Sequence, residues 1–226
     1  MKAALAALAA AQVAYGLSDR RPAATRTLLS AMLATTALEA RRAGDGRAVV
    51  AAGTVGFAAE LVGVATGRPF GRYAYSHRLG PRVGGVPLLA AGAWAAMARP
   101  AWVVAGRICA RRASRIACAA GALTAWDVFL DPRMAREGYW SWPQGGRYEG
   151  VPASNFAGWW ITGLGVFAAY AQLARDQPGD GEALALYVWT WLGETFANAV
   201  LWKRPRVAAA GAVAMGAFAV PALWRR

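Results

Sequence analysis

The sequence predicts an all-α integral membrane protein, a polytopic bundle of about eight transmembrane helices, with seven as the alternative. Three observations lead to this fold class. The chain is 57% hydrophobic and 16% charged, whereas soluble domains average about 45–50% apolar and about 25% charged residues. The apolar residues fall into successive runs, several of them close to the roughly 20 residues that span a bilayer. Clusters of arginine separate these runs, as is typical of chain segments at lipid headgroups.

The expected helices follow the apolar runs in order. They are residues 3–17, 27–40, 49–65, 86–98 or onward, 116–130, 156–173, 183–201 and 207–223. The first two runs are short, which keeps seven spans open, and Arg99 and Pro100 interrupt the fourth. Pro132 is expected to end the fifth helix. No stretch has the composition of a linker, so residues 1–226 are expected to form one transmembrane domain, multi-pass in the cell membrane.

The basic residues and the few metal-binding residue types limit the classes of function. The net charge is +13, but its arginines lie between apolar runs, so membrane lipids are expected as contacts and nucleic acid is not. Cys109 and Cys118 have neither metal-site nor disulfide spacing, and His77 is the single histidine. We therefore expect no metal and no cofactor. Basic residues are almost equally divided between the two membrane faces, which leaves the orientation open.

Six polar side chains lie within or beside the apolar runs, late in or just after the third, fifth and seventh predicted helices and at the start of the sixth. They are Glu60, Asp127, Asp131, Asn155, Glu194 and Asn198. Because successive spans cross the membrane in opposite directions, the alternation of the third to seventh spans places all six in one leaflet. The loops at residues 67–85 and 132–154 fall on the same side, where we expect them to cover the acids.

Three of the acids, Glu60, Asp127 and Glu194, lie in apolar runs that contain no basic partner. A single acid in this position is as well explained by hydrogen-bonded packing as by function. Three that converge in one leaflet favour a functional site, because charge is costly there. A carboxylic acid in apolar surroundings tends to keep its proton and can then act as a general acid.

Large aromatic side chains gather around this predicted acid cluster. The candidate substrate-binding residues are Phe70, Tyr73, Tyr75, Trp126, Tyr139, Trp140, Trp142, Asn155, Trp159 and Asn198. Tryptophan and tyrosine also form belts at membrane interfaces, and that simpler explanation accounts for several of these rings. The alternative is a wall that contacts an apolar substrate and stabilises positive charge. Both interpretations stay open at this point.

Five stretches of the sequence resemble the membrane carotenoid 1,2-hydratase family. They are ELVGVATGRPFGRYAY (60–75), LGPRVGGVP (79–87), DVFLDP (127–132), GYWSW (138–142) and GRYEGVPASNFAGW (146–159). Each stretch alone is a weak signal, and the combination is specific. The resemblance covers residues 60–160 and continues weakly to Asn198, whereas the first 45 residues carry no such signature.

The resemblance implies an enzyme of carotenoid biosynthesis that acts on an end group of γ-carotene, lycopene or bisanhydrobacterioruberin. Hydration of a terminal isopropylidene double bond requires a proton donor, a sheltered tertiary carbocation and water, without a redox cofactor or metal. Glu60, Asp127, Asp131 and Glu194 would then be the catalytic candidates. The carotenoid would enter from the lipid phase, and other carotenoid-biosynthesis enzymes would be partners. A membrane carotenoid cyclase that starts with the same protonation, and a non-enzymatic carotenoid-binding or transport protein, are the alternatives.

Overall fold

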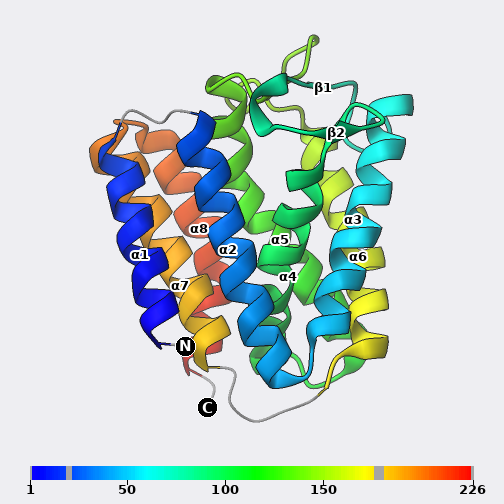
Figure 1. Cartoon of the computed structure of the whole chain (residues 1–226), viewed down its shortest axis with the longest axis vertical. Coiled ribbons are helices and arrows are strands. Elements are labelled where there is room, and N and C mark those ends of the chain that lie inside the picture. The colour runs from blue at the N-terminus through cyan, green and yellow to red at the C-terminus, as the bar shows by residue number, and fades with distance from the viewer. Residues whose placement is uncertain (1, 19–21, 176–180, 225–226) are drawn as a thin grey trace.

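The computed structural model describes residues 2–18, 22–175 and 181–224, and these residues form a bundle of eight α-helices (Figure 1). The helices are α1 Lys2–Leu17, α2 Pro22–Ala43, α3 Gly46–Thr66, α4 Leu88–Ile108, α5 Arg112–Arg136, α6 Ala153–Leu173, α7 Gly181–Phe196 and α8 Pro205–Trp224. A π-helical turn, Ala197–Leu201, extends α7. The predicted all-α fold class is confirmed.

Four of the described helices are long and apolar enough to cross a membrane, namely α3, α4, α5 and α8, and α1 is a shorter apolar helix. Valines on the outside of the bundle, such as Val50 and Val213, are exposed, as expected where a surface contacts lipid tails. These features identify a helical membrane bundle. The number of helices that cross the bilayer stays a prediction.

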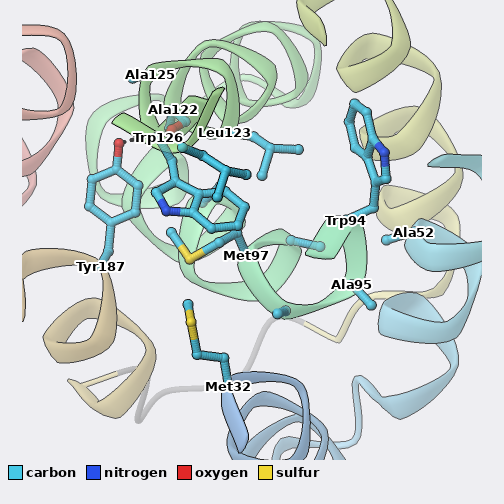
Figure 2. Close-up of a cluster of buried hydrophobic side chains, with 14 of the residues drawn as sticks. Met32, Ala52, Trp94, Ala95, Met97, Ala122, Leu123, Ala125, Trp126 and Tyr187 are labelled. Carbon is cyan, nitrogen blue, oxygen red and sulfur yellow. Dashed lines mark hydrogen bonds between the residues drawn. The ribbon is translucent and has the colours of Figure 1, made fainter. Parts of the chain in front are cut away.

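The core is built around α4, the most buried of the four long apolar helices, which packs against α2, α3, α5, α7 and α8. Figure 2 shows Met97 of α4 beside Trp126 of α5, with Tyr187 of α7 on the same side. The Tyr187 hydroxyl donates to the carbonyl of Ala122 at 3.0 Å. Trp94 lies on the other side of the core, near α3. The large aromatic side chains therefore occupy two separate sides of the α4–α5 pair.

The prediction that Pro132 ends the fifth helix was wrong, because α5 continues through it to Arg136. A proline inside a helix has no N–H for the carbonyl four residues earlier, which here is that of Val128. The hydroxyl of Tyr148 donates to that carbonyl at 3.0 Å. The loop after α5 thus supplies the hydrogen bond that the proline removes.

Pro100 is accommodated in α4 in the same way, so the fourth helix is continuous. The carbonyl that lacks a helical partner belongs to Ala96. It accepts a hydrogen bond of 2.7 Å from the Thr36 hydroxyl of α2. Sequence rules that treat proline as a helix end miss such side-chain donors on neighbouring elements.

Two loops meet at one end of the bundle through short β-pairings. Strand β1, Ala74–Tyr75, pairs antiparallel with β4, Trp140–Ser141, and places Tyr75 opposite Trp140. In the first loop, β2, Arg82–Val83, pairs with β3, Val86–Pro87. Figure 1 shows β1 and β2 at the end of the bundle where α3 ends, beside its last turn. The prediction that both loops lie on one side of the bundle is confirmed.

Candidate active site

Glu60 lies buried on α3, with 4% of its surface exposed, and accepts three hydrogen bonds from neutral groups. The Trp94 indole nitrogen donates to Oε1 at 3.1 Å, and the Tyr75 hydroxyl donates to Oε2 at 2.9 Å. The Tyr73 hydroxyl also donates to Oε2. Burial, and then the charge of Glu60, raise the pKa of both tyrosines, so their hydroxyls keep their protons and remain donors.

Two glycines of α3 make room for these donors. A Cβ atom at Gly56 would lie 2.3 Å from Cγ of Trp94, and one at Gly63 would lie 2.8 Å from the Tyr73 hydroxyl oxygen. Both distances are shorter than non-bonded carbon and oxygen atoms tolerate. Glycine at these positions therefore lets the two side chains reach Glu60 from either side.

Asp127 and Asp131 lie one helical turn apart on α5, and both are buried. The Asn155 side-chain amide, at the start of α6, donates to Oδ2 of Asp127 at 3.0 Å and also to Oδ2 of Asp131. The Trp140 indole nitrogen donates to Oδ1 of Asp131 at 3.0 Å. Oδ1 of Asp127 has no partner among the described residues. One amide therefore holds both carboxyl groups next to each other.

Adjacent carboxyl groups in a buried site repel each other when both are ionised. Such a pair is most stable with one proton between the two groups, as in carboxylate dyads of acid catalysts. Asp131 borders the neighbouring cavity, whereas Asp127 lies behind Asn155. If the pair releases its proton toward the cavity, Asp131 is the group that reaches the acceptor.

Glu60 and Asp131 line the same cavity, which is named here the acid cavity. Its volume is about 30 Å³, which corresponds to about one water molecule. Its aromatic walls come from the loops and from α4 and α6, and they comprise Phe70, Tyr73, Tyr75, Trp94, Trp140, Trp142 and Trp159. The Tyr75 ring centroid lies 5.5 Å from those of both Tyr73 and Trp140. The rings of Trp94 and Trp159 stack at 4.2 Å.

Most of the residues predicted from sequence meet at this cavity. Those that line it are Glu60, Phe70, Tyr73, Tyr75, Asp131, Trp140, Trp142, Asn155 and Trp159, and Asp127 joins them through Asn155. Sequence analysis missed Trp94, which donates to Glu60. The sequence does contain one indication of this role, because Trp94 is a single large aromatic residue among the alanines and glycine of the first turns of α4.

Glu194 does not join these acids. Its own apolar run contains no basic residue, but α5 supplies a basic partner, Arg133. Glu194 accepts a hydrogen bond of 2.8 Å from the Arg133 guanidinium in a buried ion pair. Asn198 belongs to the same group and donates to the Glu194 carbonyl at 2.9 Å. Arg133 is two residues beyond Asp131, which is about 200° around a helix. The two side chains therefore face opposite sides of α5.

The ion pair borders a second cavity, named here the ion-pair cavity, between α1, α2, α5 and α7. Its volume is about 490 Å³, and Trp126 lines it. The Arg133 guanidinium also lies 5.5 Å from the ring centroid of Trp202. Tyr139 is likewise turned away from the acids, since its hydroxyl donates to Thr25 of α2 at 2.6 Å. The predicted site residues Trp126, Tyr139, Glu194 and Asn198 thus lie outside the acid cavity.

No group of three or more His, Cys, Asp or Glu side chains within residues 2–18, 22–175 and 181–224 is arranged to hold a metal ion. The carboxyl groups of the acid cavity are engaged instead by neutral hydrogen-bond donors on indole, phenol and amide groups. The carboxyl groups of the acid cavity can give and accept protons, and aromatic side chains surround them.

Comparisons with known proteins agree with this arrangement. A family model described as "Carotenoid biosynthesis protein" matches residues 23–220, which include every residue of the acid cavity. A bisanhydrobacterioruberin hydratase of Haloarcula japonica is 33% identical over 169 residues, covering 68% of this chain. The match spans 56% of that relative's length. No solved structure matches the chain. The chain belongs to the carotenoid biosynthesis protein family.

Proposed function

We propose that this protein is a carotenoid 1,2-hydratase that adds water across the terminal double bond of an acyclic end group. The product is a tertiary 1-hydroxy carotenoid. The proposal rests on one observation above all, the Asp127–Asp131 pair held by Asn155 across an aromatic cavity from Glu60. The similarity to a protein named a hydratase supports the same reaction class.

Asp131 is the proposed proton donor because it lies beside Asp127, with which it would share a proton, and because it borders the acid cavity. An alkene without a neighbouring carbonyl is a weak base, so its protonation needs a neutral acid held against it in a dry site. Transfer of the Asp131 proton to C2 breaks the terminal double bond and leaves a tertiary cation at C1. Asn155 and Trp140 donate to the carboxylate that remains.

The aromatic walls stabilise the cation at C1. The Tyr75 ring, which lines the cavity, makes edge contacts with the rings of Tyr73 and Trp140. An aromatic face near a cation contributes about 0.5–2 kcal/mol, and more as water is excluded. The cavity holds about one water molecule as it stands, so an end group enters only when side chains lining the cavity move.

Glu60 is the proposed base for the water molecule. Burial disfavours the ionised carboxylate, and the three donors to its oxygens oppose that effect. The water adds its oxygen to C1, and one of its protons passes to Glu60. After the product leaves and a new water molecule enters the cavity, the proton returns from Glu60 to the aspartate pair, so each cycle consumes one alkene and one water.

Room for a water molecule beside the acids favours hydration over the cyclase alternative, in which the cation closes onto a ring double bond. The distribution of acids favours an enzyme over a passive pigment carrier, because the acids cluster at one end of the bundle. The carotenoid is proposed to enter from the lipid phase of the cell membrane, next to other carotenoid-biosynthesis enzymes that supply it.

The test is product analysis in a host that makes lycopene or γ-carotene, with and without this chain. We expect a 1-hydroxy carotenoid whose hydroxyl oxygen derives from ¹⁸O-labelled water and whose C2 gains a solvent proton. A cyclised product would identify the cyclase. Oxygen label from O₂ would indicate a hydroxylase, and unchanged pigment bound to the purified protein would indicate a carrier.

A further inference from the structure

An apolar groove on the outside of the bundle lies between α2 and α3, with α4 as its floor. Its volume is about 620 Å³. Both α2 and α3 pack closely on α4 but touch each other little, and Figure 1 shows α4 between them. Among the described residues, no charged side chain lines the groove. Its polar hydroxyl, that of Thr54, is satisfied by the Val50 carbonyl at 3.0 Å.

Small residues give the groove its depth. Gly53 of α3 and Gly92 of α4 are both buried, and Ala91 and Ala95 lie beside them. A Cβ at Gly92 would lie 3.3 Å from the Leu33 side chain, and one at Gly53 would lie 3.1 Å from the Ala91 carbonyl oxygen. Larger residues would fill this space, so the surface offers a long hollow to the lipid phase.

The groove adjoins the acid cavity on all three helices. On α3, Glu60 lines the cavity and the next residue, Leu61, lines the groove. On α4, Leu89 lines the cavity, and Leu88 lines the groove. On α2, Leu29 lines the cavity, and Leu33, one turn further along, lines the groove. The two linings are therefore adjacent in the chain on α3 and α4, and one helical turn apart on α2.

The groove is also long. Its lining on α3 extends from Leu61 to Gly46, which corresponds to about 22 Å along a helix. The ion-pair cavity extends on α7 and its π-helical continuation from Trp189 to Leu201, about 18 Å, so length alone does not distinguish the two. However, the ion-pair cavity contains the Arg133–Glu194 charges, for which a hydrocarbon chain has no partner.

We propose that this groove binds the polyene chain of the substrate and delivers its end group past Leu89 to Glu60 and Asp131. The inference rests on the proposed hydratase function and adds a site for the part of the substrate that does not react. It also makes the protein selective for long chains, since contacts along the groove lower the free energy of binding only for a substrate that reaches them.

The test uses a groove-filling substitution at the far end, Val50→Trp. Val50 is 69% exposed, so the larger side chain should not disturb the core. It lies ten residues from Glu60, about 15 Å along the helix. The two probes are lycopene and a synthetic acyclic isoprenoid with the same end group that is too short to reach Val50. The readouts are kcat/KM in detergent micelles and lycopene retained per purified protein.

We expect Val50→Trp to lower kcat/KM for lycopene by about tenfold or more, and to change the value for the short probe by less than about twofold. Ala91→Phe, next to the acid cavity, should lower both values. The matched control is Val213→Trp on the exposed face of α8, which should change neither. Equal loss for both probes in Val50→Trp, or no loss for lycopene, would overturn the inference.

Gly193→Phe tests the competing location. Gly193 lines the ion-pair cavity, and a Cβ there meets nothing within 4 Å. Selective loss of lycopene turnover in Gly193→Phe would place the polyene in that cavity and refute the groove.

The amount of lycopene retained by the purified protein separates the groove proposal from the hydratase proposal. If the wild type retains lycopene without hydrating it and Val50→Trp retains none, the groove stands and the hydratase proposal fails.

Discussion

The two cavities on either side of α5 contain similar residue types but differ in how charge is balanced. In the acid cavity, Glu60 and Asp131 are held by neutral donors. In the ion-pair cavity, Glu194 is neutralised by Arg133. A guanidinium compensates the charge of a carboxylate directly, whereas neutral donors leave a buried carboxyl group free to take part in proton transfer. The partner of an acid therefore predicts its role better than its burial does.

The largest expected effect comes from Asp131→Asn, which keeps the shape but removes the acid. We expect turnover per folded protein to fall by about 10²–10⁴-fold, the usual contribution of a general acid. Glu60→Gln should also reduce turnover strongly. Glu194→Gln is the matched control, and there we expect less folded protein but near-normal turnover. Turnover would be measured by chromatography of the carotenoids, normalised to monodisperse protein. Full activity in Asp131→Asn, or a comparable loss in Glu194→Gln, would contradict the comparison.

Loss of the buried ion pair should affect stability rather than chemistry. Arg133→Met leaves the Glu194 carboxylate without its cation, and we expect destabilisation by about 3–5 kcal/mol. Thermal unfolding in detergent would show this as a lower Tm. The double variant Arg133→Met with Glu194→Met removes both charges and should recover most of the loss. If the double variant were no more stable than Arg133→Met, the ion pair would not be the cause.

Tyr75→Phe should lower turnover by about tenfold, because it removes one of the three hydrogen bonds to Glu60. The pKa of the Tyr75 hydroxyl is raised above its usual value by burial and by Glu60, so it remains protonated below and above neutral pH. The ratio of wild-type to variant turnover should therefore stay constant between about pH 6 and pH 9. A ratio that approaches one at high pH would mean that the hydroxyl ionises in this range.

The smallest effects are expected from the hydroxyl groups that replace proline's missing hydrogen bonds. Tyr148→Phe and Thr36→Val each leave one helix carbonyl unpaired, at a cost of about 1–2 kcal/mol in unfolding free energy. Val128 lies between Asp127 and Asp131, so Tyr148→Phe should also slow turnover about two- to threefold, whereas Thr36→Val should not. Equal activity in both variants would show that this turn of α5 is insensitive to its carbonyl.

The depth of the acids in the bundle could be predicted from sequence, but the direction in which they face could not. Alternation of successive helices correctly brings Glu60, Asp131 and Asn155 to one end. It carries no information about rotation around each axis, and for that reason Glu194 was placed with the wrong partners. Continuing α5 through Pro132 would have placed Arg133 at the same end of the bundle as Glu194 and so identified it as a candidate partner.

The role of Trp94 could not be predicted from sequence for a different physical reason. Its role depends on Gly56 of α3, which lets the indole approach Glu60 from another helix. Contacts between residues so far apart in the chain follow from packing, and neither composition nor periodicity contains them. Tyr75 and Trp140 could be placed near the acids from sequence, whereas their pairing across β1 and β4 could not.

The pairing of β1 with β4 links access to the acids with their chemical state. Tyr75 on β1 donates to Glu60, and Trp140 on β4 donates to Asp131. Separation of these two-residue strands would open the acid cavity to bulk water and withdraw one hydrogen bond from each acid in the same movement. With the strands apart, the protein would lack the hydrogen bonds that hold Glu60 and Asp131 in their proposed roles and would be inactive. Each closure would enclose the substrate with the water then present in the cavity. The rate at which the strands separate and pair again would set the upper limit on turnover.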